Sequence, residues 1–150
     1  MSAKVSTGYA AEEVSRSGET VSKLETDRNG RPLVLVADDE EDILILVSIR
    51  LDRAGCEVVT ATNGKQALDL ILERRPDIAV LDVRMPKLTG IEVLRQVRAS
   101  AAVRDTPVLL LSAGVQEESI SQGLEAGANE YMKKPFSPDE LAARVEAMLG

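Results

Sequence analysis

The stretch Leu33-Val34-Leu35-Val36-Ala37-Asp38-Asp39-Glu40 consists of five apolar residues in a row followed at once by three acids. A strand with one face in water would alternate apolar and polar residues, so an unbroken apolar run indicates a strand that is buried on both faces. Strands of this kind occur in parallel sheets that helices cover on both sides. The acids mark the place where the strand leaves the core, at its carboxyl end.

The same pattern recurs along the chain and predicts an α/β fold with a doubly wound parallel sheet. Further apolar runs, which predict four more strands, lie at 58–61, 78–81, 108–111 and 131–132. Apolar residues at helical spacing predict five helices. The first stops at Gly55 and carries Ile43, Leu46, Val47, Ile49, Leu51 and Ala54. The others are expected at 64 to about 75, at 90–99, between Gly114 and Gly127, and after Ser137. Ser137, Pro138 and Glu140 have the pattern of a capping box at the start of that last helix.

Residues 1–30 differ in composition from the rest of the chain. They are rich in Ser, Thr, Glu and Lys and have few large apolar residues, and Asn29-Gly30 closes them with a turn signal. We therefore expect a tail that is disordered or partly helical between Ala10 and Glu25. Residues 31–150 are expected to form one domain.

Composition excludes several classes of function. The chain has no histidine, which removes most zinc sites, Ser-His triads and histidine acid/base chemistry. Its formal net charge of −7 makes direct contact with nucleic acid unfavourable. No apolar run is long enough to cross a membrane, and no secretory signal begins the chain. The single cysteine, Cys56, is expected to be a small buried hydrophobe and suits a reducing cytoplasm, where we expect the protein to be.

Polar residues follow four of the predicted strands. Asp38 and Asp39 follow the first, Asp82 the third and Ser112 the fourth, and Lys134 comes just after the fifth. The carboxyl ends of parallel strands meet at one edge of a sheet, so these residues are expected to share one crevice.

Three carboxylates in one crevice repel each other unless a cation lies between them. Mg²⁺ prefers oxygen ligands and commonly uses one or two carboxylates together with water and a phosphate, so the acids predict a Mg²⁺ site. Lys134 adds a positive charge and Ser112 a hydroxyl donor, both suited to phosphate oxygens. The chemistry implied is phosphoryl transfer to a carboxylate, which needs positioning and charge neutralisation more than acid/base groups.

The motifs in their order resemble those of the response-regulator receiver family of two-component systems. They are 34–40 (Val-Leu-Val-Ala-Asp-Asp-Glu), 81–86 (Leu-Asp-Val-Arg-Met-Pro) with Gly90, 111–113 (Leu-Ser-Ala) and 131–136 (Tyr-Met-Lys-Lys-Pro-Phe). Ser112 and Lys134 follow Asp82 at spacings of 30 and 52 residues, which match the family pattern. The resemblance covers residues 31–150.

The resemblance implies a flavodoxin-like fold of five β–α units with strand order 2-1-3-4-5. It makes Asp82 the phosphoacceptor. It also implies a Mg²⁺ site to which Asp82 contributes, with Asp39 as a direct ligand, Asp38 as a largely water-mediated one and the backbone carbonyl of Arg84 as a further ligand.

The resemblance further implies that Ser112, Ala113 and Lys134 bind the phosphoryl group. Ser112 and Tyr131 become a switch pair, and Pro135 follows a cis peptide bond. Phosphorylation then changes the face formed by the helix between Gly114 and Gly127, the strand at 131–132 and the last helix.

The implied donor is a histidine kinase or phosphotransfer protein, and the implied output is a protein target bound through that face. We expect no turnover beyond self-phosphorylation and autodephosphorylation. Ile120 and Asn129 stand where DNA-binding relatives often place charged residues that pair across a dimer, so we expect a monomer or a weak dimer.

Other interpretations are open at this stage. The acids at 38–42 could be only a solvated helix start, and Arg84 could be a solvent-facing charge instead of a residue that tunes reaction rates. A phosphatase of the haloacid-dehalogenase type would need a second acid at the position of Arg84. A pseudo-receiver would usually lack Asp39, Asp82 or Lys134. The chain could stand alone or be a fragment of a longer regulator with an effector domain.

Overall fold

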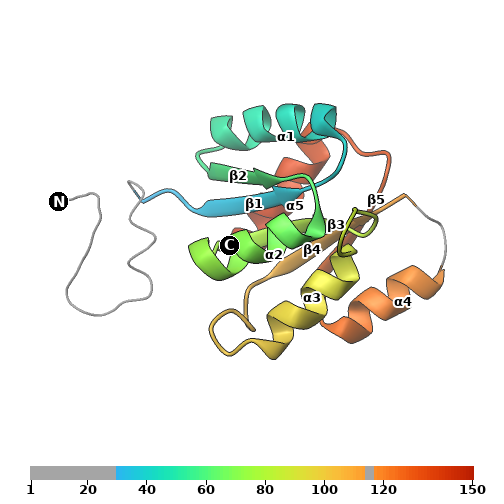
Figure 1. Ribbon diagram of the computed structural model, residues 1–150. Helices are drawn as coiled ribbons and strands as arrows, with labels where there is room; N and C mark the ends of the chain where they lie inside the picture. Colours follow the sequence, from blue (N-terminus) through green and yellow to red (C-terminus); the bar gives the residue numbers. More distant parts are fainter. Residues whose placement is uncertain (1–29, 114–116) are drawn as a thin grey trace, which may run out of the picture.

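The structure, a computed structural model, describes residues 30–113 and 117–150. A central parallel sheet is covered by helices on both faces (Figure 1). The strands are β1 (Leu33–Ala37), β2 (Glu57–Ala61), β3 (Ile78–Asp82), β4 (Val108–Ser112) and β5 (Glu130–Lys133). The helices are α1 (Glu41–Arg53), α2 (Gly64–Arg74), α3 (Gly90–Ala99), α4 (Glu117–Ala126) and α5 (Pro138–Leu149).

The strand order is β2-β1-β3-β4-β5, and every neighbouring pair is parallel. The predicted flavodoxin-like fold is therefore confirmed. From β1 the chain moves to one side to form β2 and then to the other side to form β3. The order of strands thus reverses between β1 and β3, and a crevice is expected at the carboxyl ends of these two strands.

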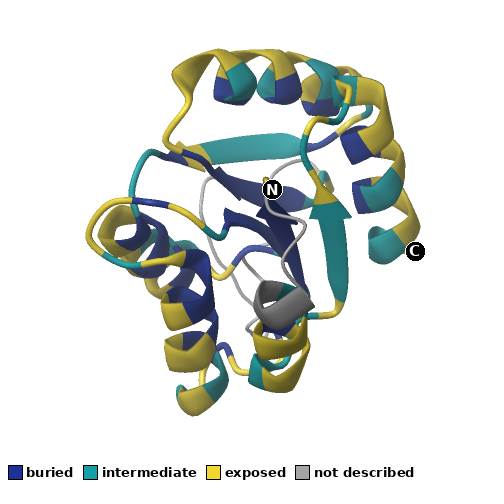
Figure 2. Cartoon of the chain, turned by 90° about the vertical axis from the view of Figure 1, so that its right-hand side faces the viewer, coloured by how far each residue is buried: buried dark blue, intermediate teal, exposed yellow. Residues whose placement is uncertain are grey.

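The sheet separates two hydrophobic cores. Val34 and Val36 of β1 pack with α1 and α5 on one face, whereas Leu35 and Ala37 pack with α2 and α3 on the other. This alternation follows from the two-residue repeat of a strand. All five residues of β1, β3 and β4 are buried, and the exposed surface lies on the outer sides of the helices (Figure 2). The apolar runs at 33–37, 78–81 and 108–111 thus correspond to strands buried on both faces, whereas β2 and β5, at the two sides of the sheet, are mostly half-buried.

Local signals set the start of several helices. The Ser137 hydroxyl accepts a hydrogen bond from the Glu140 amide at 3.0 Å, and the Glu140 carboxylate accepts one from the Ser137 amide at 2.7 Å. The predicted capping box of α5 is therefore confirmed. Thr89 and Glu92 form a second box at the start of α3, which fixes the loop after β3.

The buried face of α1 is narrower than the sequence pattern predicted. Of the apolar residues that predicted α1, Leu46 and Ile49 are 55% and 47% exposed, because only the stripe with Leu44, Val47 and Leu51 faces the sheet. A helix on a sheet buries one stripe, so apolar residues beyond it stay in contact with solvent.

Three other expectations from the sequence concern the N-terminal tail, the single cysteine and membrane-spanning helices. The predicted tail lies outside the described residues except for Gly30, and so does Gly114. Cys56 is buried, as expected. No helix in the described part of the chain is long and apolar enough to cross a membrane.

Gly90 at the start of α3 allows a close contact that carries a testable consequence. A Cβ atom at this position would meet the Asp82 carbonyl oxygen and lie 3.1 Å from Val83 Cα. Backbone atoms cannot move aside as a flexible side chain can, so Gly90→Ala should lower the free energy of unfolding by about 1–3 kcal/mol. Urea unfolding measures this loss. The control is Gln96→Ala on the exposed side of the same helix, and equal stability of both variants would contradict the prediction.

Candidate functional site

Two buried carboxylates lie side by side at the switch in strand order. Ala37 of β1 pairs with Leu81 of β3. Asp38 and Asp82, which follow this pair, therefore lie side by side at the strand ends. Asp38 is 0% exposed and Asp82 is 3% exposed. The structure thus brings together residues that are far apart in the sequence, as the pattern of strand ends predicted.

Lys134 neutralises part of this negative charge. Its ammonium lies 2.9 Å from Asp38 Oδ2 and 3.1 Å from Asp82 Oδ2. Only 13% of the Lys134 side chain is exposed, so the charge acts in an environment with little water. Its position depends on the loop after β5, where the Lys134 amide donates a hydrogen bond to the Ser112 carbonyl at 2.8 Å.

The environment changes the protonation of both groups. Burial, and then the charge of Asp38, raise the pKa of Asp82 to about 6, although the hydrogen bond from Lys134 acts in the opposite direction. Burial alone would lower the pKa of Lys134, but the nearby carboxylates of Asp38 and Asp82 raise it well above its usual range. Lys134 therefore remains charged, and Asp82 is a carboxylate at neutral pH that gains from any further cation nearby.

The chemistry of the acids fits such a cation. One oxygen atom each from Asp38, Asp39 and Asp82 lie within 4.8 Å of one another. Asp39 is exposed, which leaves its carboxylate accessible from solvent. Although Asp38 Oδ2 is close to the ammonium of Lys134, its geometry there does not make a hydrogen bond. A buried carboxylate oxygen without a hydrogen bond, among oxygen donors only, suits a hard divalent cation.

The loop after β3 provides a backbone donor to the Asp82 carboxylate. The Arg84 amide donates a hydrogen bond to Asp82 Oδ1 at 3.3 Å, and the Arg84 residue is exposed. The Gly90 amide donates to the Val83 carbonyl at 2.9 Å, which folds the loop back towards the strand end. The role of the Arg84 carbonyl as a metal ligand stays a prediction.

The residues predicted to bind phosphate and to switch occupy the neighbouring strands. Ser112, the last residue of β4, is 5% exposed, and the adjacent Ala113 is exposed. Tyr131 in β5 pairs with Leu110 and is half-buried against the core beneath α2 and α3. The peptide bond between Lys134 and Pro135 is cis. The roles of these residues in binding and switching stay predictions.

One contact in the site had no counterpart in the sequence analysis. Glu40 Oε1 lies 3.2 Å from the ammonium of Lys134. The only signal in the sequence was the third acid directly after β1, and the pairing itself depends on contact between residues 94 positions apart.

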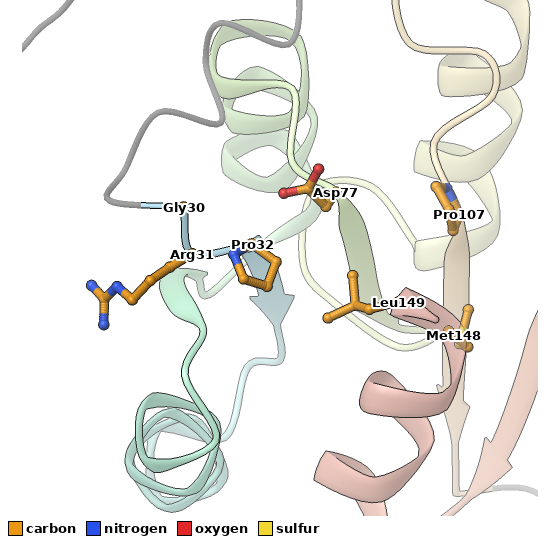
Figure 3. A pocket seen from close by; sticks show the side chains of 7 residues that line it. All are labelled: Gly30, Arg31, Pro32, Asp77, Pro107, Met148 and Leu149. Atoms are coloured by element: carbon orange, nitrogen blue, oxygen red, sulfur yellow. The ribbon is translucent and has the colours of Figure 1, made fainter. Parts of the chain in front are cut away.

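A separate pocket lies at the amino ends of the strands, opposite the acidic site. It has a volume of about 380 Å³, and Pro32, Asp77, Pro107 and Leu149 are among the residues that line it (Figure 3). The Asp77 carboxylate accepts a hydrogen bond from the Leu33 amide at 2.8 Å, so this acid helps to fix the start of β1. The pocket contains none of the residues predicted from the motifs.

Comparison with known proteins identifies the family of this arrangement. The family model of the response regulator receiver domain matches residues 34–146, which include the acids, Ser112 and Lys134. The chain belongs to the response regulator receiver family. Receiver domains of this family are parts of two-component systems, so the resemblance drawn from the motifs is confirmed.

Individual relatives agree with this assignment. The alkaline phosphatase synthesis transcriptional regulatory protein PhoP of Bacillus subtilis is 47% identical over 116 residues, which cover 77% of this chain and 48% of that protein. The chemotaxis response regulator CheY4 of Vibrio cholerae has a TM-score of 0.74 at 35% identity, with 79% of this chain and 98% of that chain covered. The DrrB receiver domain activated with BeF3 has a TM-score of 0.70 at 36% identity, with coverage of 79% and 97%. This receiver chain spans about half the length of the curated relatives that it matches.

The raised pKa of Asp82 predicts a pH-dependent stability. At pH values between 3.8, the ordinary pKa of Asp82, and about 6, its pKa in the folded protein, Asp82 keeps a proton in the folded state that it has lost in the unfolded chain. Folding therefore becomes less favourable as the pH rises through this interval, by up to about 3 kcal/mol at pH 7. In buffer with a metal chelator, Asp82→Asn should be more stable than the wild type at pH 7, and the gain should shrink towards pH 4.

Urea unfolding of both proteins across pH 4–7 measures this difference. The exposed Asp69→Asn serves as control, because loss of its surface ion pair with Lys65 should cost less than about 1 kcal/mol at any pH. A difference between wild type and Asp82→Asn that does not vary with pH would show that burial of Asp82 is not the cause.

Proposed function

We propose that Asp82 accepts a phosphoryl group from the phosphohistidine of a histidine kinase or a phosphotransfer protein, and that the product switches a protein-binding face. The observation that carries the proposal is the place of Asp82: a buried carboxylate at the end of β3, beside Asp38 and 3.1 Å from the ammonium of Lys134. Membership of the receiver family supports the same reaction.

The proposed reaction needs no acid or base from the protein. An oxygen of the Asp82 carboxylate attacks phosphorus, the new O–P bond forms, and the P–N bond to the donor imidazole breaks. The electron pair of that bond stays on the imidazole nitrogen, which takes a proton from solvent. Because charge develops on the phosphoryl oxygens, positioning and neutralisation by Lys134 and by hydrogen-bond donors contribute most to the rate. Hydrolysis of the product is the only turnover that we propose.

Mg²⁺ is the proposed cofactor, with Asp39, Asp38, Asp82 and the Arg84 carbonyl as the residues that would hold it. The buried Asp38 oxygen without a hydrogen bond and the set of oxygen donors support this choice. When bound, the ion would neutralise charge on the phosphoryl oxygens and on the acids. Ser112 and Ala113 are proposed to bind the remaining phosphoryl oxygens.

The proposed output face consists of α4, β5 and α5. Arg144 of α5 pairs with Glu130 of β5 at 3.2 Å and also contacts the Tyr131 carbonyl at 3.4 Å, so β5 and α5 are linked near Tyr131. We propose that Ser112 and Tyr131 respond together to phosphorylation and that a protein target binds this face. The names of the curated relatives describe transcriptional regulators, and the part that matches this chain is about half of their length. We propose that residues 31–150 make no direct contact with nucleic acid, act in the cytoplasm and remain monomeric or weakly dimeric.

The first test concerns the phosphoacceptor. Acetyl phosphate with Mg²⁺ should add one phosphoryl group to the wild type, and Asp82→Asn should remain unmodified, because the amide cannot form the acyl phosphate. Intact-protein mass spectrometry measures both. The control is Asp69→Asn, which removes an exposed carboxylate on α2 and should be labelled like the wild type. Equal labelling of Asp82→Asn would assign the reaction to another residue.

The second test concerns the metal. Asp39→Ala should weaken Mg²⁺ binding at least about tenfold, because the site loses a charged oxygen ligand. Glu41→Ala removes the same charge from the exposed first turn of α1 and should change the affinity far less. Calorimetric titration of both variants decides the matter, and similar affinities would remove Asp39 from the ligand set.

A further inference from the structure

Three carboxylates share the ammonium of Lys134, and they differ in one respect. Asp38 and Asp82 are buried, whereas 61% of the Glu40 side chain is exposed. A buried carboxylate that loses its cation is left without solvation, but an exposed one is rehydrated by water. Glu40 is therefore the partner that Lys134 can exchange most easily for another anion.

The local structure of Glu40 indicates that its side chain is directed to this contact. Glu40 occupies the N-cap position of α1, where a side chain commonly accepts a hydrogen bond from the first turn, yet it makes no such bond. Its amide instead donates to Asp38 Oδ1 at 2.9 Å, which ties its backbone to the site. With the backbone fixed there, the carboxylate reaches Lys134 at 3.2 Å.

The pair also lies at an opening next to the phosphoacceptor. Glu40 and Lys134 line a pocket of about 450 Å³ together with Ile43, Ala113 and Phe136. An anion in this pocket would lie next to both the Glu40 carboxylate and the Lys134 ammonium. The Glu40 carboxylate competes with such an anion for the ammonium of Lys134.

We infer that Glu40 is a positioning residue that holds Lys134 in the unphosphorylated state and slows phosphorylation of Asp82. The inference rests on the proposed function of Asp82 as phosphoacceptor. When a phosphoryl group arrives, its oxygens take the place of the Glu40 carboxylate at the ammonium. Without the Glu40 charge, Lys134 keeps its two buried partners, Asp38 and Asp82, and no longer has to release Glu40 before it binds the incoming group.

The test measures the rate at which acetyl phosphate labels Asp82 in the full chain, with Mg²⁺ at saturating concentration. Glu40→Gln should raise the second-order rate constant about two- to fivefold, the range expected when one partly exposed ion pair is lost. Glu40→Asp keeps the charge but is one methylene shorter, so it should lose the contact with Lys134 and react as fast as Glu40→Gln. Glu41→Gln removes an equal charge one residue further along and should react like the wild type.

These variants separate a contact with Lys134 from a general effect of charge. A Glu40→Asp variant that reacts like the wild type, or a Glu41→Gln variant as fast as Glu40→Gln, would overturn the inference in favour of long-range repulsion. Equal rates for wild type and Glu40→Gln would also overturn it. Failure of the proposed function has a different signature, because the wild type itself would then remain unlabelled at Asp82.

An equilibrium measurement tests the same exchange without covalent chemistry. Beryllofluoride is the probe, and its affinity for the Mg²⁺-saturated protein should rise about two- to fivefold in Glu40→Gln and in Glu40→Asp. Thermal unfolding of the unliganded variants shows whether the fold is retained. An unchanged affinity in both variants would contradict competition between Glu40 and the phosphoryl group for Lys134.

Discussion

The ammonium of Lys134 is the charge on which the arrangement of the acidic site depends. It lies 2.9 Å from Asp38 and 3.1 Å from Asp82, two carboxylates that have almost no contact with solvent. Without a cation between them, repulsion and lost hydration would make this pair of neighbours strongly unfavourable. Lys134 does not remove this unfavourable energy completely, because the pKa of Asp82 remains raised. The site therefore retains affinity for a further positive charge.

The parallel sheet explains why the polar groups gather in this place. Apolar residues on both faces of β1, β3 and β4 leave no room for charges inside the sheet, so the acids stand where the strands end. The strand order then brings the ends of β1 and β3 together and places the loop after β5 within reach. The opposite ends of the strands are held by local contacts such as that between Asp77 and Leu33, and among the described residues there is no comparable group of charges there.

Lys134 also connects the acidic site to β5, the outermost strand on one side of the sheet. Its amide is bonded to the end of β4, and the strand that precedes it contains Tyr131 and Glu130, which contact Arg144 of α5. We propose that a change in the partners of the ammonium is transmitted to β5 through this short segment of backbone. This path gives a physical reason to propose that chemistry at Asp82 and binding at the face of α4, β5 and α5 are coupled.

The sequence by itself determined where the strands lie along the chain, the burial of β1, β3 and β4, the capping box at Ser137 and the residues that stand at the strand ends. These features are local, because the spacing of apolar residues records which side of a strand or helix meets the core. The tertiary structure decided which stripe of α1 is buried and that Glu40 joins Asp38 and Asp82 around Lys134. It also set the raised pKa of Asp82. Such contacts join residues up to 94 positions apart and depend on distances of a few ångströms, and the spacing of residues along a chain does not encode distances of that kind.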